Sequence, residues 1–371
     1  MIALLAAAAL SAAQIHTIET SVRQSMAARQ IPSVVVRVDV DGTNVYSKAF
    51  GYRDVANRAA ADDRTRYQYG SITKQFTAAA VLALQDDGKL SIDDRIGKWL
   101  PAFAKFPVTI RQLLIHTGAV ADFTEHPWYL KEYFTNPFVN YEPLLKWSAS
   151  QPLEFAPGSK AQYDNAGYVI LARIVEKASG KTFFDYLKDR FFSPLGMTSV
   201  APQTFFRIEP DTANGYMFAA IPELQTIGLK SKSELFPAIA WNLEQADGAG
   251  FLVGDAADLQ KWDDALLGHR VFTGAAEKLF YTAGRLGNGK PAYTGPENPA
   301  RRPAEYCYGG VAKFTGAGYE AYGANGGTPG FLAFTATIPA QHIALTILTN
   351  HGADLDNSKL TNPVLAALVT K

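Results

Sequence analysis

The chain has 371 residues, of which 47% are hydrophobic and 12% aromatic, enough to fill one large core or two intertwined ones. Lysine plus arginine and aspartate plus glutamate both total 35, so the formal net charge is zero. Because no basic stripe or arginine-rich run is present, nucleic acid is not an expected partner.

Residues 1–13, MIALLAAAALSAA, have the pattern of a secretory signal peptide. The apolar run ends in the small residues Ser11, Ala12 and Ala13, as at a cleavage site. No lysine or arginine precedes the run, so an alanine-rich helix start is the alternative. The run is too short to span a bilayer, and no later segment is long and apolar enough. The expectation is therefore an exported protein, periplasmic or secreted, without an integral membrane segment after signal removal.

Residues 14–70 are expected to form the N-terminal part of an α/β domain. A helix over about residues 14–30 is predicted by four apolar residues at helical spacing, Ile15, Ile18, Val22 and Met26. Two strand-like runs follow, SVVVRVDV and NVYSKAFGY. Asp41-Gly42 between them is a favoured pair for a tight turn, so the runs predict a β-hairpin.

Residues 71–200 are expected to form a helical region. Its runs are TKQFTAAAVLALQDDGKL, TIRQLLIHTGA, AGYVILARIVEKASGK and TFFDYLKDRFFSPLGM. Gly88 and Gly180 stand near the ends of two of these runs, where helix stops are expected. Thr182 with Asp185 three residues later resembles an N-terminal capping box.

Residues 201–371 are expected to complete the α/β domain. The strand-like runs are YCYGGVAKF, GYEAYGA, GFLAFTATI and IALTILTN, and a closing helix is predicted with Asn362 as cap and Pro363 as first residue. Strands and a helix at both ends predict an α/β (α+β) fold. In it, one antiparallel sheet is built from both chain ends and flanked by helices, with the helical region inserted between them.

Several reactive residue types are expected to be structural. Cys307, the single cysteine, lies in a strand-like run and predicts a buried thiol. His116 lies near a helix end, where a structural role outweighs catalysis. Four aspartate pairs near turns or helix ends are expected to be solvated: Asp62 and Asp63, Asp86 and Asp87, Asp93 and Asp94, and Asp263 and Asp264. Neither a thiolate cluster nor His-Glu-x-x-His occurs, so no metal or cofactor is predicted.

Ser71 and Lys74, in the segment GSITKQF, form the first candidate catalytic pair. Residues three positions apart lie on one face of a helix, so their side chains can meet. A lysine with a lowered pKa can take the proton of a serine, and outward-pointing N–H groups at a helix start favour developing negative charge. Alone, Ser71 is more simply a helix cap and Lys74 a solvated lysine.

Tyr163-Asp164-Asn165 lies just before a strong helix pattern. A tyrosine hydroxyl near an ammonium group can relay a proton or exist partly as phenolate, and an asparagine amide can hold both the lysine and a substrate carbonyl. The plain alternative is a turn that caps the helix from Ala166, with Tyr163 packed in the core.

A glycine-rich segment, YGANGGTPGFLAF, leads into a predicted strand. Glycines allow a substrate to approach a strand edge closely, and the backbone N–H of Gly327 could pair with that of Ser71 as an oxyanion hole. An ordinary hairpin turn through Pro329-Gly330 is the alternative.

The order Ser-x-x-Lys, Tyr-x-Asn and glycine-rich strand resembles that of class C β-lactamase-like and penicillin-binding-protein-like serine hydrolases, which include esterases and D-aminopeptidases. Further similar segments cover most of the chain: FGYRDVANR, TIRQLLIHTG, GYVILARIVEKASGKTFFDYL, GAGFLVGDAADLQKWDDALL and GGTPGFLAF. The resemblance implies a Ser71 acyl-enzyme, with Lys74 and Tyr163 sharing the base role. Asn165 would position Lys74 and the substrate, and the N–H groups of Ser71 and Gly327 would bind the oxyanion.

The third motif departs from the family pattern. The triplet Ala324-Asn325-Gly326, the expected substrate-binding strand, stands where the family has lysine or histidine first. Alanine cannot bind a substrate carboxylate, so the prediction is hydrolysis of small-molecule or peptide esters or amides lacking that group. Arg301 or Arg302 could supply a substitute cation, although solvation is the simpler role. The alternatives are a β-lactamase or D,D-peptidase and a noncatalytic ligand-binding homologue.

Overall fold

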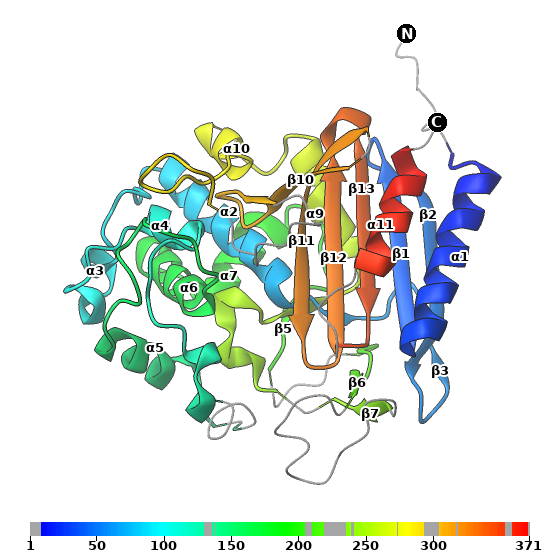
Figure 1. Cartoon of the computed structure of the whole chain (residues 1–371), viewed down its shortest axis with the longest axis horizontal. Coiled ribbons are helices and arrows are strands. Elements are labelled where there is room, and N and C mark those ends of the chain that lie inside the picture. Colours follow the sequence, from blue (N-terminus) through cyan, green and yellow to red (C-terminus); the bar gives the residue numbers. More distant parts are fainter. Residues whose placement is uncertain are drawn as a thin grey trace.

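The computed structural model describes residues 9–129, 136, 138–204, 210–218, 235–238, 241–272, 274–292, 304–316, 318–352 and 358–369. Within them the chain builds an eight-stranded antiparallel sheet in the order β3-β2-β1-β13-β12-β11-β10-β9 (Figure 1). Helices cover both faces of the sheet, which confirms the predicted fold class.

The N-terminal elements are α1 (Ala12–Arg29), β1 (Ser33–Val40), β2 (Thr43–Asp54) and β3 (Ala59–Ala60). Ser11 caps α1, and its side chain and that of Gln14 form a reciprocal capping box. Asp41 and Gly42 have φ values of 50° and 70°, both left-handed, as a two-residue hairpin turn requires. The predicted helix and hairpin are therefore confirmed.

The C-terminal elements are β9 (Glu305–Tyr306), β10 (Ala312–Gly316), β11 (Tyr319–Thr328), β12 (Phe331–Ile338), β13 (Ile343–Thr349) and α11 (Ser358–Val369). Strand β13 pairs with β1 from Val34↔Thr349 to Val40↔Ile343. The two parts of the sheet, far apart in sequence, therefore join near its middle.

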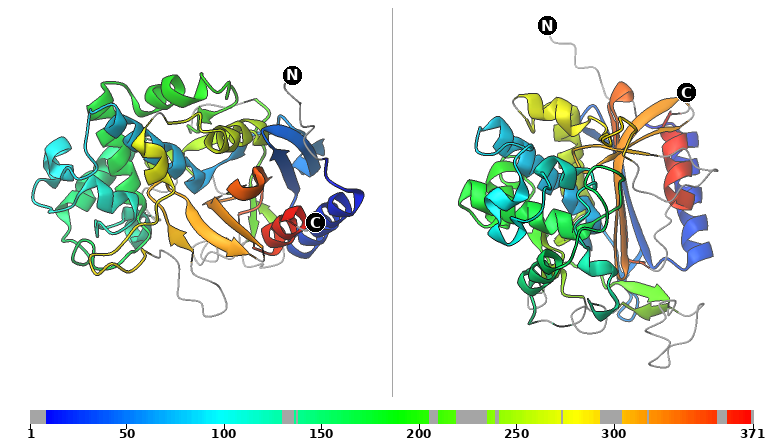
Figure 2. Two further views of the ribbon diagram at one scale, coloured as in Figure 1. Left: turned by 90° about the horizontal axis from the view of Figure 1, so that it is seen from above. Right: turned by 60° about the vertical axis from the view of Figure 1, so that its left-hand side comes forward.

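Alternation along the strands separates two apolar clusters. In β1, Val34, Val36 and Val38 face a cluster shared with α1 and α11, whereas Val35 faces the larger cluster on the other side. Helices α1 and α11 lie side by side on one face of the sheet, and the remaining helices lie on the opposite face (Figure 2).

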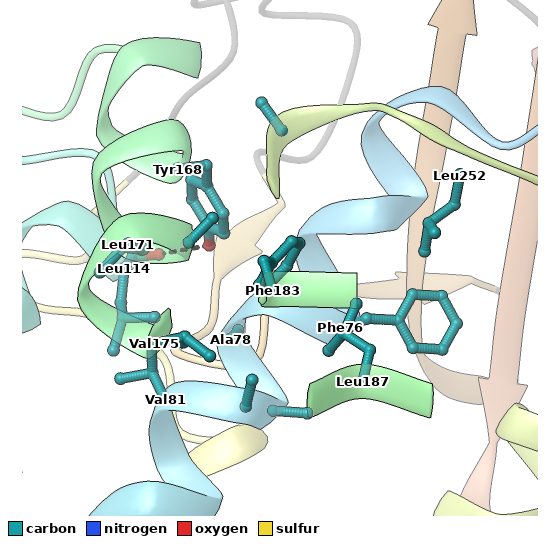
Figure 3. Packing of buried hydrophobic residues seen from close by; sticks show 14 of the residues in the cluster. Phe76, Ala78, Val81, Leu114, Tyr168, Leu171, Val175, Phe183, Leu187 and Leu252 are labelled. Carbon is teal, nitrogen blue, oxygen red and sulfur yellow. Dashed lines mark hydrogen bonds between the residues drawn. The ribbon is translucent and has the colours of Figure 1, made fainter. Parts of the chain in front are cut away.

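The opposite face carries the helical layer. Its elements are α2 (Thr73–Asp86), α3 (Ile96–Trp99), α4 (Ile110–Leu114), α5 (Tyr141–Ser150), α6 (Asn165–Ser179), α7 (Phe183–Leu187), a π-helical turn (Lys188–Phe192), α9 (Ala256–Leu267) and α10 (Ala275–Phe280). Residues Thr73–Leu84 of α2 are all buried, so this helix is the centre of the layer. Apolar side chains of α2, α6 and α7 pack together around it (Figure 3).

Short elements complete the layer beside α2. One small sheet has the order β4-β8-β5 and consists of β4 (Tyr67–Gln68), β8 (Leu252–Gly254) and β5 (Ala201–Pro202). A two-stranded sheet pairs β6 (Tyr216–Phe218) with β7 (Leu235–Pro237). Because β4 ends three residues before Ser71, its pairing with β8 fixes the approach of the chain to that residue.

The predicted start of the closing helix is wrong. Helix α11 begins at Ser358, so Pro363 lies inside it. A proline has no N–H to donate to the carbonyl four residues earlier, here Lys359. The hydroxyl of Ser25 on α1 donates to that carbonyl at 3.4 Å, so a contact between helices replaces the missing bond.

The prediction that all aspartate pairs are solvated is also wrong for one pair. Asp263 is 2% exposed, and its carboxylate accepts a hydrogen bond from the hydroxyl of Thr335 in β12. Leu259, Trp262 and Leu266 line the same buried side of α9, so helical periodicity carries Asp263 inward with them. The residues 1–8 of the predicted leader and Arg301 and Arg302 lie outside the described residues.

Candidate active site

Ser71 lies in a 3-10 turn, η1 (Gly70–Ile72), that runs directly into α2. The expected capping role is wrong, because Ile72 occupies the N-cap position of α2 and no side chain caps the helix. The Ser71 hydroxyl instead accepts a hydrogen bond from Nζ of Lys74 at 3.1 Å. The sequence pair is thus brought together as predicted, one turn apart.

Lys74 is 1% exposed and uses three acceptors. Its Nζ donates to Ser71 Oγ, to Asn165 Oδ1 at 2.8 Å and to the backbone carbonyl of Ala249 at 2.9 Å. Burial lowers the pKa of Lys74 to about 7, although two nearby aspartates favour its charged form. A lysine in this state can lose its proton near neutral pH and then accept one from serine.

The Lys74 ammonium group lies over the ring of Tyr163. Nζ of Lys74 is 4.7 Å from the centroid of the tyrosine ring. Desolvation raises the pKa of Tyr163 far above its ordinary value, and a hydrogen bond with Ser71 offsets this only in part. The residue as a whole is 36% exposed, so the ring borders solvent while its hydroxyl faces Ser71. These properties favour a protonated Tyr163 hydroxyl at neutral pH over a phenolate.

Asn165 is the first residue of α6 and is held by a network that the sequence did not reveal. Its Oδ1 accepts from Lys74, its Nδ2 donates to Thr124 Oγ1 at 3.0 Å, and its backbone N–H donates to Asp122 Oδ2 at 2.7 Å. Asp122 also accepts from the backbone N–H and hydroxyl of Thr124, each at 2.9 Å. The helix cap is Asp164, which leaves the Asn165 amide for Lys74.

Strand β11 packs directly against the turn that holds Ser71. A Cβ atom on Gly326 would lie 1.8 Å from the carbonyl oxygen of Tyr69, and one on Gly70 would lie 2.8 Å from the nitrogen of Gly327. Only glycine permits this approach of two backbones. The nitrogens of Ser71 and Gly327 therefore lie on facing segments.

The residues of the third motif lie beside this seam. The ladder between β10 and β11 ends at Gly323, so β11 continues past Ser71 beyond the pairing with β10. Ala324 packs against the cluster on the helical side, the same side as Gly326. Asn325 is exposed and alternates to the opposite side, so its side chain is not brought to Ser71.

Three residues at the site were not predicted from the sequence: Ala249, Asp122 and Thr124. Each contributes through a group that no sequence motif marks. The carbonyl of Ala249 is a backbone atom, and Gly248 beside it accepts from the hydroxyl of Thr77 at 2.6 Å. Asp122 and Thr124 form the hydrogen-bonded turn that begins the 3-10 turn Phe123–Glu125. The Asp-Phe-Thr sequence signals that turn, but not its contact with Asn165.

Metal coordination, membrane insertion and thiol chemistry would each need a distinct feature in the described part of the chain. No group of three histidine, cysteine, aspartate or glutamate side chains there could hold a metal ion. None of the described helices is long and apolar enough to cross a membrane. Cys307 is buried as predicted, and desolvation raises the pKa of its thiol to about 12.

Comparison with known proteins gives a match over nearly the whole chain. The sequence profile of the family described as Beta-lactamase matches residues 18–369. Penicillin-binding protein 4* of Bacillus subtilis is 27% identical over 253 residues, 67% of this chain. The chain covers only 55% of that relative's length, but 81% of penicillin-binding protein 4 of Amycolatopsis lactamdurans, which is 28% identical over 342 residues.

Solved structures show the same fold. The D-amino acid amidase of Ochrobactrum anthropi, in complex with L-phenylalanine amide, aligns over 96% of this chain and 99% of its own, with a TM-score of 0.80 and 23% identity. An octameric penicillin-binding protein homologue from Pyrococcus abyssi aligns over 95% of this chain and 76% of its own, with a TM-score of 0.78 and 24% identity.

Proposed function

Because this chain belongs to the β-lactamase family, we propose that it is a serine hydrolase that forms an acyl-enzyme on Ser71 with an ester or amide substrate. One observation carries the proposal: a buried lysine whose pKa is lowered to about 7 lies 3.1 Å from the hydroxyl of Ser71. Burying a lysine against a serine lowers the stability of the protein, and a noncatalytic binding protein would gain nothing from this arrangement.

The proposed acylation begins with neutral Lys74. Lys74 takes the proton of Ser71, directly or through Tyr163, while Ser71 Oγ forms a bond to the carbonyl carbon. The carbonyl electron pair moves to oxygen, where the N–H groups of Ser71 and Gly327 stabilise it. Collapse of this intermediate breaks the bond to the leaving group, which receives the proton from Lys74.

Deacylation uses the same proton path, with water in place of the serine hydroxyl. Water gives a proton to Tyr163 as its oxygen attacks the acyl carbon, and Tyr163 passes its own proton to Lys74. Collapse then releases the acid and returns a proton to Ser71 Oγ. Asn165 keeps Lys74 in place throughout, because its own amide is fixed by Thr124 and its N–H by Asp122.

A fluorophosphonate probe tests the nucleophile. Intact-mass spectrometry should show one adduct on the protein and none on the Ser71→Ala variant. A matched control is Ser91→Ala, which changes a serine in a surface turn and should leave labelling intact. Absence of an adduct on the folded protein would favour the noncatalytic ligand-binding alternative.

The proposed substrates are neutral at the end that β11 would contact. Ala324 presents a methyl group on the site-facing side of the strand, and a methyl group cannot pair with a carboxylate. We expect faster turnover of a short p-nitrophenyl ester than of a cephalosporin, measured as kcat/KM. Faster hydrolysis of the cephalosporin would support the β-lactamase or D,D-peptidase alternative, and Ala324→Lys should shift the ratio towards the carboxylate-bearing substrate.

Export remains part of the proposal, and the structure sharpens its test. Cleavage after Ala13 would remove Ser11 together with the first two residues of α1. The N-terminal mass of the protein recovered from the periplasm or medium should therefore begin near Gln14. If the protein stays in the cytoplasm at full length, residues 11–13 serve as the start of α1 and its cap, and the export proposal is wrong.

A further inference from the structure

We propose that His116 is a positioning residue that holds Tyr163 against Ser71 and so controls proton transfer there. This role rests on the proposed function. His116 follows α4 and is 1% exposed, and it contacts neither Ser71 nor Lys74 through a hydrogen bond described for the site. It acts on Tyr163 through a ring contact and through hydrogen bonds to the two neighbouring residues.

The first support is a pair of hydrogen bonds that bracket Tyr163. The backbone carbonyl of His116 accepts from the N–H of Gln162 at 2.9 Å. The ring Nδ1 of His116 accepts from the N–H of Asp164 at 3.1 Å. The residues immediately before and after Tyr163 are thus both tied to one histidine, which fixes the backbone from which the tyrosine ring projects.

The second support is the ring contact. The imidazole centroid is 4.5 Å from that of Tyr163, with an interplanar angle of 33°. Tyr168 and Tyr306 pack against the same imidazole at 5.1 and 4.6 Å. Tyr168 is itself anchored, because its hydroxyl donates to the carbonyl of Leu114 (Figure 3). The imidazole is therefore held by two buried tyrosines while it supports the third.

The third support is the charge state. An Nδ1 that accepts a hydrogen bond places the single proton of the neutral ring on Nε2. Nε2 is buried and has no hydrogen-bond partner among the described residues. Desolvation and the charge of Lys74 hold the pKa of His116 well below its usual range. His116 therefore serves as a neutral platform and takes no part in the proton transfer itself.

The side-chain chemistry explains why a histidine is suited to this position. Phenylalanine would supply a flat ring but no acceptor for the Asp164 N–H, and asparagine would supply the acceptor but no ring. The backbone of His116 has φ of 57°, in the left-handed region that asparagine tolerates well. His116→Asn thus removes the ring contact while keeping the backbone conformation and an acceptor.

The test is a double-mutant cycle with Tyr163→Phe. His116→Asn alone should lower kcat by about 10- to 100-fold, because a displaced relay misaligns the proton transfer, and should leave KM within about 3-fold. In the Tyr163→Phe background, where no relay hydroxyl remains to be positioned, the same substitution should have little further effect. An equal loss in both backgrounds would overturn the proposal and leave His116 a general structural residue.

Two additions keep the test decisive. His342→Asn is the matched control, because His342 is exposed and has a similar φ of 51°; it should change neither kcat nor KM. If His116→Asn folds poorly, Tyr306→Leu can replace it, because this variant removes one support of the imidazole. Tyr306→Leu should slow fluorophosphonate labelling of the otherwise wild-type protein and have little further effect in the Tyr163→Phe background. A wild-type protein that is not labelled at Ser71 would refute the proposed function, whereas labelled protein with no effect of these variants would refute only the role of His116.

Discussion

The burial of the Lys74 side chain sets the pH at which the proposed hydrolase becomes active. With its pKa lowered to about 7, Lys74 changes from ammonium to amine as the pH rises through that value. We expect kcat/KM for a neutral ester to rise with pH and to reach a plateau above about pH 8. Lys74→Arg keeps a charge at every accessible pH and should lower kcat/KM by about 10²- to 10⁴-fold. A flat pH profile in the wild type would contradict the assignment of Lys74 as base.

The same residue gives a stability prediction of definite sign. The pKa of Lys74 falls from the ordinary 10.5 to about 7 on folding, so the folded protein binds fewer protons than the unfolded chain between these values. The free energy of unfolding should therefore gain a contribution from Lys74 as pH rises from about 7 to 10.5. Denaturant unfolding of the wild type and of Lys74→Met at several pH values should show this difference, with Lys98→Met, an exposed lysine, as control.

Asp264 should have the opposite effect. Burial and the neighbouring charge of Asp39 raise the pKa of Asp264 from 3.8 to about 7, so the folded protein binds more protons than the unfolded chain between these values. This contribution to stability is present at low pH and is lost as pH rises through about 7. Asp264→Asn should raise the melting temperature at pH 8 by about 1–3 °C and have less effect at pH 5. Asp41→Asn, on the exposed hairpin turn, is the control, and an equal shift at both pH values would argue against the titration.

At the scale of elements, the contact of β11 with η1 depends on the absence of a side chain. In Gly326→Ala the new Cβ would collide with the carbonyl of Tyr69, so β11 must move away from Ser71. We expect a loss of about 10²- to 10³-fold in kcat, as when one oxyanion donor is removed, together with a lower melting temperature. Gly287→Ala is the control, because its Cβ would meet no atom closer than 3.7 Å. An unchanged kcat in Gly326→Ala would show that the close contact of β11 with η1 is not needed for catalysis.

The contact between α1 and α11 offers a second test at this scale. Ser25→Ala should lower the free energy of unfolding by about 1 kcal/mol, because the Lys359 carbonyl loses its donor. In a Pro363→Ala background the helix can supply its own N–H to that carbonyl, so the Ser25 effect should shrink. Denaturant unfolding of the four variants measures the coupling, and purely additive effects would show that Ser25 does not replace the missing helix bond.

Local patterns predicted the elements well where the cause of the structure is local. The spacing of Ile18 and Val22 and the Asp41-Gly42 turn gave α1 and the first hairpin, because periodicity and turn geometry act over a few residues. The start of α11 was misplaced because the bond that compensates for Pro363 comes from Ser25, more than three hundred residues earlier. A propensity rule contains no information about such a partner.

At the scale of the whole molecule, the antiparallel sheet was predictable because strand patterns occur at both ends of the chain, on either side of the predicted helical region. The meeting of Ser71, Lys74 and Asn165 was predictable through spacing and the family resemblance. The support around them was not, because the Ala249 carbonyl and Asp122 reach the site from segments without a motif. Long-range packing, rather than local sequence, determines that support.

The pairing of β1 with β13 has a consequence for how the protein is made. The Cα partners Val34 and Thr349 are separated by most of the chain, so the ribosome must synthesise nearly all of it before this ladder can form. Until then the apolar hairpin of β1 and β2 has an unpaired edge that can join with other nascent chains. Closing so long a loop late slows folding, while the helical layer built from α2 to α7 can assemble earlier from nearer contacts. Efficient production of this protein should therefore depend on chaperone protection of its first hairpin.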